Sequence, residues 1–307
     1  MARVGTIDIG TNSVLLLVTE QVGGVLLPQR EISTVTRLGQ GVDKSRRLAA
    51  PAVERTLECL REYRRILTEL HVEQLAVVGT SALRDALGAE EFLVRAQELL
   101  AVPVEVISGE REARLAFSGA LSGLSVSGRV LVIDIGGGST EFIVGECNSG
   151  LHTVQSLVSL NIGSVRLTER HVASDPPTKA ELEALRRDVD RELAAVGLPG
   201  KVGTVVGVAG TVTTLASVIR KHSRFDANAL HGTELTLDEL NLCLAELSRI
   251  PVNAREALVG MNPGRADVIV AGACILQMAL SYAGAQNLQV SARGVRWGLA
   301  QELTSSG

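Results

Sequence analysis

Two stretches of the chain repeat one pattern of apolar and polar residues. Residues 4–18 read Val-Gly-Thr-Ile-Asp-Ile-Gly-Thr-Asn-Ser followed by five apolar residues, and residues 130–145 read Val-Leu-Val-Ile-Asp-Ile-Gly-Gly-Gly-Ser-Thr-Glu-Phe-Ile-Val-Gly. Each copy predicts a buried strand, a Gly-rich turn and a returning strand, because short apolar runs bounded by glycine are typical of strands. The repeat therefore predicts a chain made of two related halves.

The remaining segments predict helices that alternate with further strands. An amphipathic pattern predicts a helix over about 49–70, and Thr178 with Glu181 forms a capping-box pattern that opens a helix ending near 196. The other predicted strands lie near 32–38 and at 75–78, 104–107 and 202–208, and the other predicted helices begin near 110, after the turn at 209–214 and near 268. This alternation predicts an α/β fold.

The length of 307 residues suits two domains, each with its own core. We predict an N-terminal domain over 1–126 and a second domain over 127–307, with the limit at Ser127 just before the second copy of the repeat. Aromatic residues make up only 2% of the chain, so the cores must be built from Val, Leu, Ile and Ala, which suits buried parallel strands and packed helices.

Charge and cysteine content exclude several classes of function. The net charge of -4 means that a polyanion must be held by local groups or by metal, and it disfavours nucleic acid as a partner. The four cysteines are far apart, without a C-x-x-C pair, which argues against a zinc ribbon and a disulfide framework. The apolar stretch 268–280 is too short to span a membrane, and no signal-peptide pattern follows Met1, so we expect a cytoplasmic protein without a membrane anchor.

The Gly-rich turns are candidate phosphate-binding sites. Neither a spaced G-x-G-x-x-G before a helix nor a G-K-[ST] ending is present, but consecutive backbone N–H groups in a Gly-rich turn still form an anion-binding nest. Glycine and asparagine also favour plain hairpin turns, so the turns alone leave both interpretations open. The acid that precedes each turn favours phosphate binding over a plain hairpin turn. The predicted donors are Gly10, Thr11, Asn12 and Ser13 in the first copy and Gly136, Gly137, Gly138, Ser139 and Thr140 in the second.

Asp8 and Asp134 are candidate ligands for Mg²⁺. Each follows an apolar strand, and Mg²⁺ is commonly bound through one or two carboxylates, waters and substrate phosphate oxygens. The alternative is that each Asp side chain bonds the N–H groups of its own turn. We expect Mg²⁺ as the cofactor, with other divalent cations as alternatives.

The chain resembles the exopolyphosphatase/guanosine pentaphosphate phosphohydrolase family, in the superfamily of actin, sugar kinases and heat-shock ATPases. The resemblance rests on an ordered series of segments over nearly the whole chain. They are 8–13, 80–85, 108–117 (Ser-Gly-Glu-Arg-Glu-Ala-Arg-Leu-Ala-Phe), 134–142, 163–169, 207–215, 266–272 and Gly294-Val295-Arg296. It implies two ribonuclease-H-like (actin-like ATPase) domains around a cleft, and a last helix, about 298–307, that packs back on the first domain.

The resemblance also implies residue roles. Glu112 matches the family's catalytic base, Glu141 matches a metal-site position, and Gly210, Thr211 and Arg84 match positions that border the phosphates. Family members are often dimers, so a homodimer is a further expectation. The chain departs from the family pattern at Ala292 and Trp297, where acidic residues are common.

The predicted function is hydrolysis of the terminal phosphoanhydride of inorganic polyphosphate. The alternative within the family is a phosphohydrolase of guanosine pentaphosphate (pppGpp), because the shared motifs do not choose between these substrates. A sugar or acetate kinase would use similar turns, but Glu112 in its family segment argues for water as the acceptor. A non-enzymatic alternative is a catalytically inactive sensor that binds polyphosphate or nucleotide.

Overall fold

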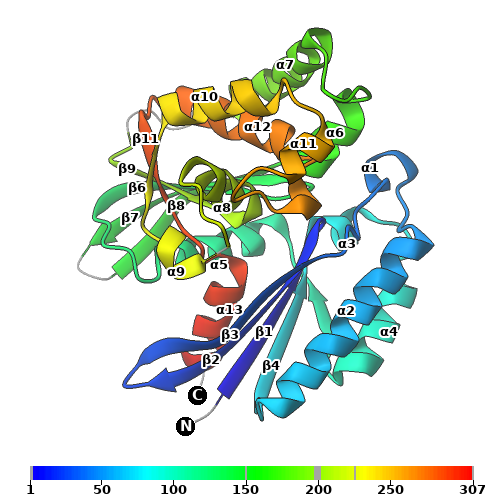
Figure 1. Cartoon of the computed structure of the whole chain (residues 1–307). Helices are drawn as coiled ribbons and strands as arrows, with labels where there is room; N and C mark the ends of the chain where they lie inside the picture. The colour runs from blue at the N-terminus through cyan, green and yellow to red at the C-terminus, as the bar shows by residue number, and fades with distance from the viewer. Residues whose placement is uncertain (1–2, 149–150, 197–201, 225, 306–307) are drawn as a thin grey trace. The chain divides into compact units, whose positions relative to one another are not determined.

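The computed structural model describes residues 3–148, 151–196, 202–224 and 226–305, and these form two compact units. Unit 1 comprises residues 1–119 and 295–307, and unit 2 comprises residues 120–294. Each unit is a mixed sheet with helices packed on it, which confirms the predicted α/β class (Figure 1). The two units are defined by how the chain packs, whereas a domain is a part that folds by itself. The domain limits predicted from the sequence therefore stay a prediction. The last two residues of the predicted C-terminal helix lie outside the described ranges.

Unit 1 contains a five-stranded sheet with the order β3-β2-β1-β4-β5. Its strands are β1 (Arg3–Ile9), β2 (Ser13–Val22), β3 (Val25–Val35), β4 (Gln74–Gly79) and β5 (Val104–Val106). Its helices are α1 (Val42–Ser45), α2 (Ala50–Glu69), α3 (Ser81–Asp85), α4 (Glu90–Leu100), α5 (Gly109–Leu121), which runs past the limit of the unit, and α13 (Val295–Ser305).

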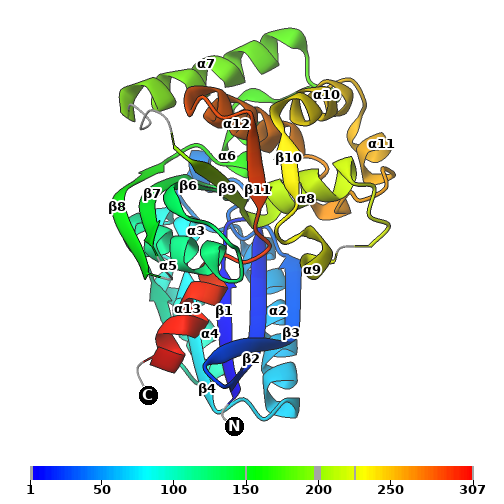
Figure 2. The same ribbon diagram turned by 90° about the vertical axis from the view of Figure 1, so that its left-hand side faces the viewer.

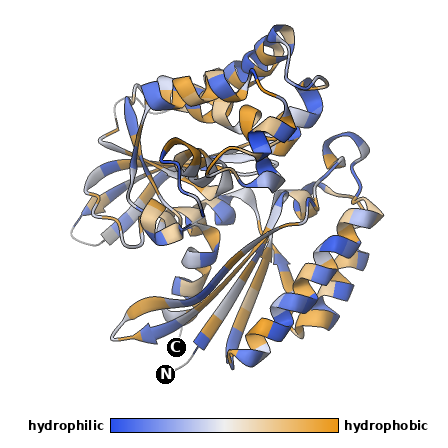
Figure 3. Ribbon diagram, in the orientation of Figure 1, coloured by the Kyte–Doolittle hydropathy of each residue, from blue (hydrophilic) through white to orange (hydrophobic). Residues whose placement is uncertain are grey.

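Alternation of side chains along β2 explains how this sheet is covered. Leu16 and Val18 point into the core formed with α2 and α4, whereas Leu17 packs with Trp297 of α13. Helix α2 covers one side of the sheet and α13 covers the other (Figures 1 and 2). Apolar and polar residues alternate around α2 (Figure 3). A Trp at position 297, which departs from the family pattern, serves here as a buried core residue.

Unit 2 contains a six-stranded sheet with the order β10-β11-β9-β6-β7-β8. Its strands are β6 (Gly128–Ile135), β7 (Thr140–Asn148), β8 (Leu151–Leu160), β9 (Thr204–Val208), β10 (Glu234–Thr236) and β11 (Asn287–Val290). Its helices are α6 (Ser164–His171), α7 (Lys179–Val196), α8 (Ala209–Ile219), α9 (Ala227–Leu230), α10 (Leu237–Leu247), α11 (Val252–Glu256), α12 (Ile269–Tyr282) and a 3-10 turn at Pro263–Arg265.

The repeat seen in the sequence extends to the topology of the two sheets. In unit 1, β1 pairs antiparallel with β2 and parallel with β4, and in unit 2, β6 pairs antiparallel with β7 and parallel with β9. The two predicted hairpins are thus confirmed, and each lies in the middle of its own sheet. The Thr178–Glu181 capping box is also confirmed, since the Thr178 amide donates to Glu181 at 2.7 Å and the Glu181 amide to the Thr178 hydroxyl at 3.3 Å.

The strand predicted near 32–38 differs from the observed one. β3 covers Val25–Val35, because Gly23 and Gly24 have φ of 59° and 83° and form the tight turn of a β2–β3 hairpin. The four cysteines are buried free thiols. Within the described ranges, no helix combines the length and the apolar character needed to cross a bilayer.

Candidate active site

In unit 1, the predicted site residues gather at the carboxyl ends of three parallel strands. β1, β4 and β5 are neighbours, the Thr80 amide donates to the Ile9 carbonyl at 3.2 Å, and the Ile107 amide donates to the Gly79 carbonyl at 3.0 Å. The turn after β1, helix α3 after β4 and helix α5 after β5 therefore begin side by side. Ligand sites in open α/β sheets lie at this end of the strands.

The first Gly-rich turn is held in place by a neighbouring loop. The Gly39 amide donates to the Thr11 carbonyl at 2.9 Å, and the Arg37 amide donates to the Asn12 carbonyl at 2.9 Å. Since the N–H and C=O of a trans peptide point in opposite directions, these bonds direct the Asn12 N–H away from the loop. Gly39 is required there, because a Cβ at this position would lie 2.3 Å from Thr11 Cγ2.

Three buried donors surround this turn. Within the described residues, Asn12 Nδ2, Thr36 Oγ1 and Ser81 Oγ have no hydrogen-bond partner. Buried polar groups are nearly always satisfied, so these donors are available to the acceptor oxygens of a ligand or of water. Sequence reasoning singled out neither Thr36, which lies in the strand predicted near 32–38, nor Ser81, which lies in the family segment 80–85.

Glu112 is buried beside Arg84. The Ser108 hydroxyl accepts a bond from the Arg111 amide and so starts α5, which places Glu112 one turn later. The side chain of Arg84 donates to the Glu112 carboxylate at 3.0 Å and to the Ile107 carbonyl at 3.1 Å. Burial raises the pKa of Glu112 above its ordinary value, Arg84 opposes this effect, and the charge of Asp85 adds to it.

The structure distinguishes Glu112 from Glu110 as a candidate base, which the sequence pattern alone did not. Glu112 is 8% exposed, whereas Glu110 lies on the surface and pairs with Arg114 at 2.9 Å. A buried carboxylate with a raised pKa suits proton transfer near neutral pH, and an exposed one that pairs on the helix surface suits only a helix terminus.

Replacing Arg84 with Gln is expected to move the acid limb of the pH profile of kcat/KM to higher pH. Arg84 lowers the pKa of Glu112 against the effect of burial, so its removal lets that pKa rise further. If Glu112 is the base, activity increases as it loses its proton, and the increase then occurs at higher pH. We also expect kcat/KM at pH 7 to fall about tenfold or more through loss of a charged hydrogen bond. Arg114→Gln, which affects the exposed Glu110 pair, should leave the profile unchanged, and an unshifted acid limb in Arg84→Gln would show that the two groups are not linked.

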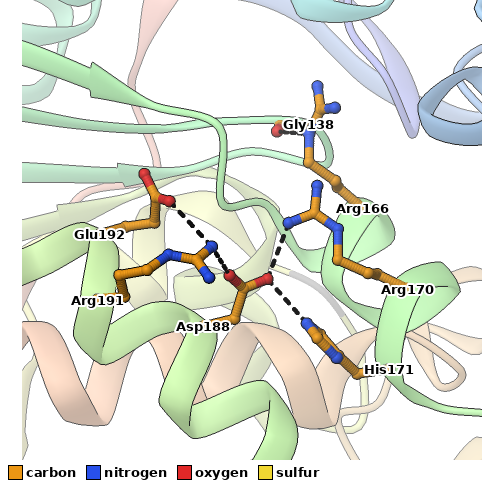
Figure 4. Close-up of polar contacts among 7 residues, drawn as sticks. All are labelled: Gly138, Arg166, Arg170, His171, Asp188, Arg191 and Glu192. Atoms are coloured by element: carbon orange, nitrogen blue, oxygen red, sulfur yellow. Dashed lines mark hydrogen bonds and ion pairs between the residues drawn. The ribbon is translucent and has the colours of Figure 1, made fainter.

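In unit 2, helix α6 fixes the orientation of the second Gly-rich turn. The Ser164 amide donates to the Gly136 carbonyl at 3.0 Å, the Val165 amide to the Gly137 carbonyl at 2.9 Å, and Arg166 Nε to the Gly138 carbonyl at 2.6 Å (Figure 4). The carbonyls face α6, so the N–H groups of residues 137–139 face the opposite side. A row of parallel N–H groups has the geometry that suits an anion.

Thr140 differs from the other predicted donors of this turn. Its side chain is fully buried and its hydroxyl donates to the Ile162 carbonyl. The hydroxyl proton of Thr140 is thus used within the unit, and this geometry does not offer it to a phosphate. Arg166, which lies in the family segment 163–169, is 8% exposed, and its Nε donates to the Gly138 carbonyl of the turn.

The family segment 207–215 begins at the end of β9 and lies next to the second turn. β9 is parallel to β6, with Val208 opposite Asp134, so Gly210 and Thr211 follow at the same end of the sheet as the turn. The hydroxyl of Thr213 donates to the Ala209 carbonyl at 3.0 Å, which is a structural role. Gly210 allows a close approach, because a Cβ there would lie 2.0 Å from the guanidinium carbon of Arg265. Arg265 is a neighbour of the motif that sequence reasoning missed.

Two carboxylates form a pair across the second hairpin. Asp134 and Glu141 are opposite each other in β6 and β7, where directly opposed side chains lie on one face of the sheet. Glu141 is 1% exposed and accepts a bond from the Ser159 hydroxyl at 2.6 Å. At the matching place in the first hairpin, Asp8 lies opposite Leu15. Of the two hairpins, the second thus has two opposed acids beside its turn, a donor set that fits Mg²⁺ with water and phosphate oxygens as its other ligands.

Comparison with known proteins defines the class. The model of the Ppx/GppA phosphatase family matches residues 17–306. Exopolyphosphatase 2 of Mycobacterium tuberculosis is 38% identical over 321 residues, covering 99% of both chains. A solved Ppx/GppA family member of Aquifex aeolicus has a TM-score of 0.83 at 35% identity over 99% of this chain and 98% of that one. An exopolyphosphatase structure from Cytophaga hutchinsonii has a TM-score of 0.90 at 28% identity, over 99% of this chain and 98% of that one.

The fold, the two turns and these similarities define a phosphoanhydride hydrolase. The chain belongs to the Ppx/GppA phosphatase family, as the ordered motifs predicted.

Proposed function

We propose that the protein is an exopolyphosphatase, which releases orthophosphate from the end of inorganic polyphosphate. The observation that carries the proposal is the buried Glu112, with its raised pKa and its bond to Arg84, at the same sheet end as a turn with unpaired donors. The similarity to proteins described as exopolyphosphatases supports polyphosphate as the substrate.

In the proposed reaction, Glu112 orients a water molecule and accepts its proton as the water oxygen attacks the terminal phosphorus. The bond from that phosphorus to the bridging oxygen breaks, and the shortened chain leaves with the bridging oxygen. Transfer of phosphoryl groups depends mainly on positioning and on stabilising charge. The proposed phosphate donors are Gly10, Thr11, Asn12, Ser13, Gly136, Gly137, Gly138, Ser139, Gly210, Thr211 and Arg84, with Thr140 contributing only through its backbone.

We propose Mg²⁺ as the cofactor, held by Asp134 and Glu141 in unit 2 and with Asp8 as the third acidic candidate. Among the described residues, no three acidic, histidine or cysteine side chains cluster as an all-protein metal site. The pair of Asp134 and Glu141 agrees with Mg²⁺, which keeps waters and binds substrate phosphates. When bound, the ion would neutralise charge on the phosphate oxygens. A homodimer and a cytoplasmic location stay predictions.

Hydrolysis of pppGpp to the tetraphosphate is the second candidate, because the same attack on a terminal phosphate would produce it and the family includes both activities. Release of orthophosphate should be measured with Mg²⁺ from long polyphosphate, tripolyphosphate, pppGpp and ATP. Greater kcat/KM with long polyphosphate supports the proposal. Cleavage of pppGpp alone would favour the second candidate, and binding of polyphosphate without any release would favour the inactive sensor.

A further inference from the structure

Helix α6 links the second Gly-rich turn to an ionic cluster around a buried carboxylate, Asp188, at the other end of the helix. Its N-terminal amides and Arg166 bind the carbonyls of Gly136, Gly137 and Gly138, as described above. Its last two residues, Arg170 and His171, both donate to Asp188 Oδ2 of α7 at 2.8 Å (Figure 4). The helix has only eight residues, which is about 12 Å of rise, so an anchor at one end constrains the other.

Asp188 is the centre of this cluster. Its side chain is 5% exposed, and its second oxygen accepts a bond from Arg191 on the following turn of α7. Arg191 also pairs with Glu192 at 3.3 Å, and α12, which packs against both helices, contributes no charged side chain. Burial acts to raise the pKa of Asp188, but hydrogen bonds from His171 and Arg170 outweigh it and lower that pKa below its usual range. The charge is therefore present at neutral pH and is lost only as the solution becomes strongly acidic.

A buried carboxylate with three cationic partners is costly to keep unless it fixes a particular arrangement. An apolar pair would hold α6 on α7 with similar stability, but it would allow the helix to slide or rotate. The bonds from Arg170 and His171 to one oxygen fix both the position of α6 along its axis and its rotation. The direction of the N–H groups at residues 137–139 depends on the position of α6, because the carbonyls of the turn are hydrogen-bonded to the N-terminus of this helix.

We propose that Asp188 is a positioning residue for the phosphate-binding turn, acting through Arg170, His171 and helix α6. The proposal rests on the proposed function of this turn as a phosphate site. Asp188 touches neither the turn nor a phosphate, so its effect is exerted entirely through the helix.

Replacement of Asp188 with Asn is expected to lower kcat/KM for phosphate release about ten- to a hundredfold, since a shift of about 1 Å in a positioning group has effects of this order. The dissociation constant of inorganic orthophosphate, measured by calorimetry, should rise in parallel. Hydrogen exchange followed by mass spectrometry should increase in segments 136–140 and 164–171, while β6 and β9 keep their protection. The matched control is Asp190→Asn, on the exposed side of the same helix, where the carboxylate accepts a bond from Tyr282.

A purely structural role predicts a different result. In that case Asp188→Asn would lower the melting temperature and raise exchange throughout unit 2, with kcat/KM and orthophosphate affinity unchanged in the folded fraction, and the inference would be wrong. If Asp188→Asn does not fold, Arg170→Gln leaves the carboxylate paired with His171 and Arg191 and should give a smaller effect of the same kind. Unchanged exchange and affinity in Arg170→Gln would then overturn the inference. Failure of the native enzyme to cleave polyphosphate would count against the proposed function instead, because the exchange and orthophosphate measurements do not depend on which phosphoanhydride is cleaved.

Discussion

Replacement of Glu112 with Gln is expected to lower kcat about 10²- to 10⁴-fold and to leave KM nearly unchanged. The amide keeps the shape of the side chain and a hydrogen-bonding oxygen for Arg84, but it has no affinity for a proton at neutral pH. Water would still be positioned, whereas its proton would have no acceptor. Steady-state release of orthophosphate from polyphosphate measures the effect, and equilibrium binding of polyphosphate to the variant shows that the substrate site is intact.

Glu110→Gln is the control for this prediction. Glu110 lies two residues away on the same helix, and its carboxylate pairs with the exposed Arg114, so the variant should keep native kcat. The raised pKa of Glu112 further predicts that native kcat/KM increases with pH through a value above the ordinary range of glutamate, and that this limb is absent in Glu112→Gln. Equal activity of the two variants would exclude Glu112 as the base.

Replacement of Gly163 with Ala is expected to lower kcat/KM by about 10²-fold or more, with little loss of secondary structure. Gly163 precedes α6 with φ of -133°, a conformation that alanine adopts freely, so backbone strain is not the reason. An added Cβ would lie 2.4 Å from the Gly137 carbonyl oxygen and 2.6 Å from the Gly138 carbonyl carbon. Either α6 or the turn must move, and the row of N–H groups at residues 137–139 moves with it.

Gly294→Ala provides a matched comparison, because a Cβ there meets no atom within 4 Å. We expect this variant to retain activity, and both variants to give the circular dichroism of the native protein. Near-native kcat/KM in a folded Gly163→Ala protein would mean that the geometry of this turn does not limit the reaction.

The sequence predicted most of what lies on the repeated pattern. Both hairpins, the α/β class and the two acids ahead of the turns follow from local signals, namely apolar runs, glycine and a carboxylate at a fixed spacing. Glu112 was selected by resemblance alone, since acids at a helix N-terminus are common for other reasons. The structure adds a physical reason to that choice, because only Glu112 of the two candidates is buried and bound to Arg84.

The parts that were missed depend on contacts between segments distant in sequence. The bonds from α6 to the turn join residues 28 positions apart, and no periodic pattern in the sequence predicts them. Thr36 and Ser81 matter only because the loop before α1 and the start of α3 lie beside the first turn. The hydroxyl of Thr140, predicted as a phosphate donor, donates to the Ile162 carbonyl for the same reason.

The most direct test of the central claim is an isotope experiment in water enriched in ¹⁸O, with enzyme in excess over polyphosphate ends so that about one turnover occurs. Attack of water on the terminal phosphorus places one ¹⁸O in the released orthophosphate and none in the shortened chain, which mass spectrometry distinguishes. We expect this distribution, and we expect Glu112→Gln to abolish the label within the same time. Label in the chain and unlabelled orthophosphate would instead mean that water attacks the neighbouring phosphorus, and the proposed attack on the terminal phosphorus would be wrong.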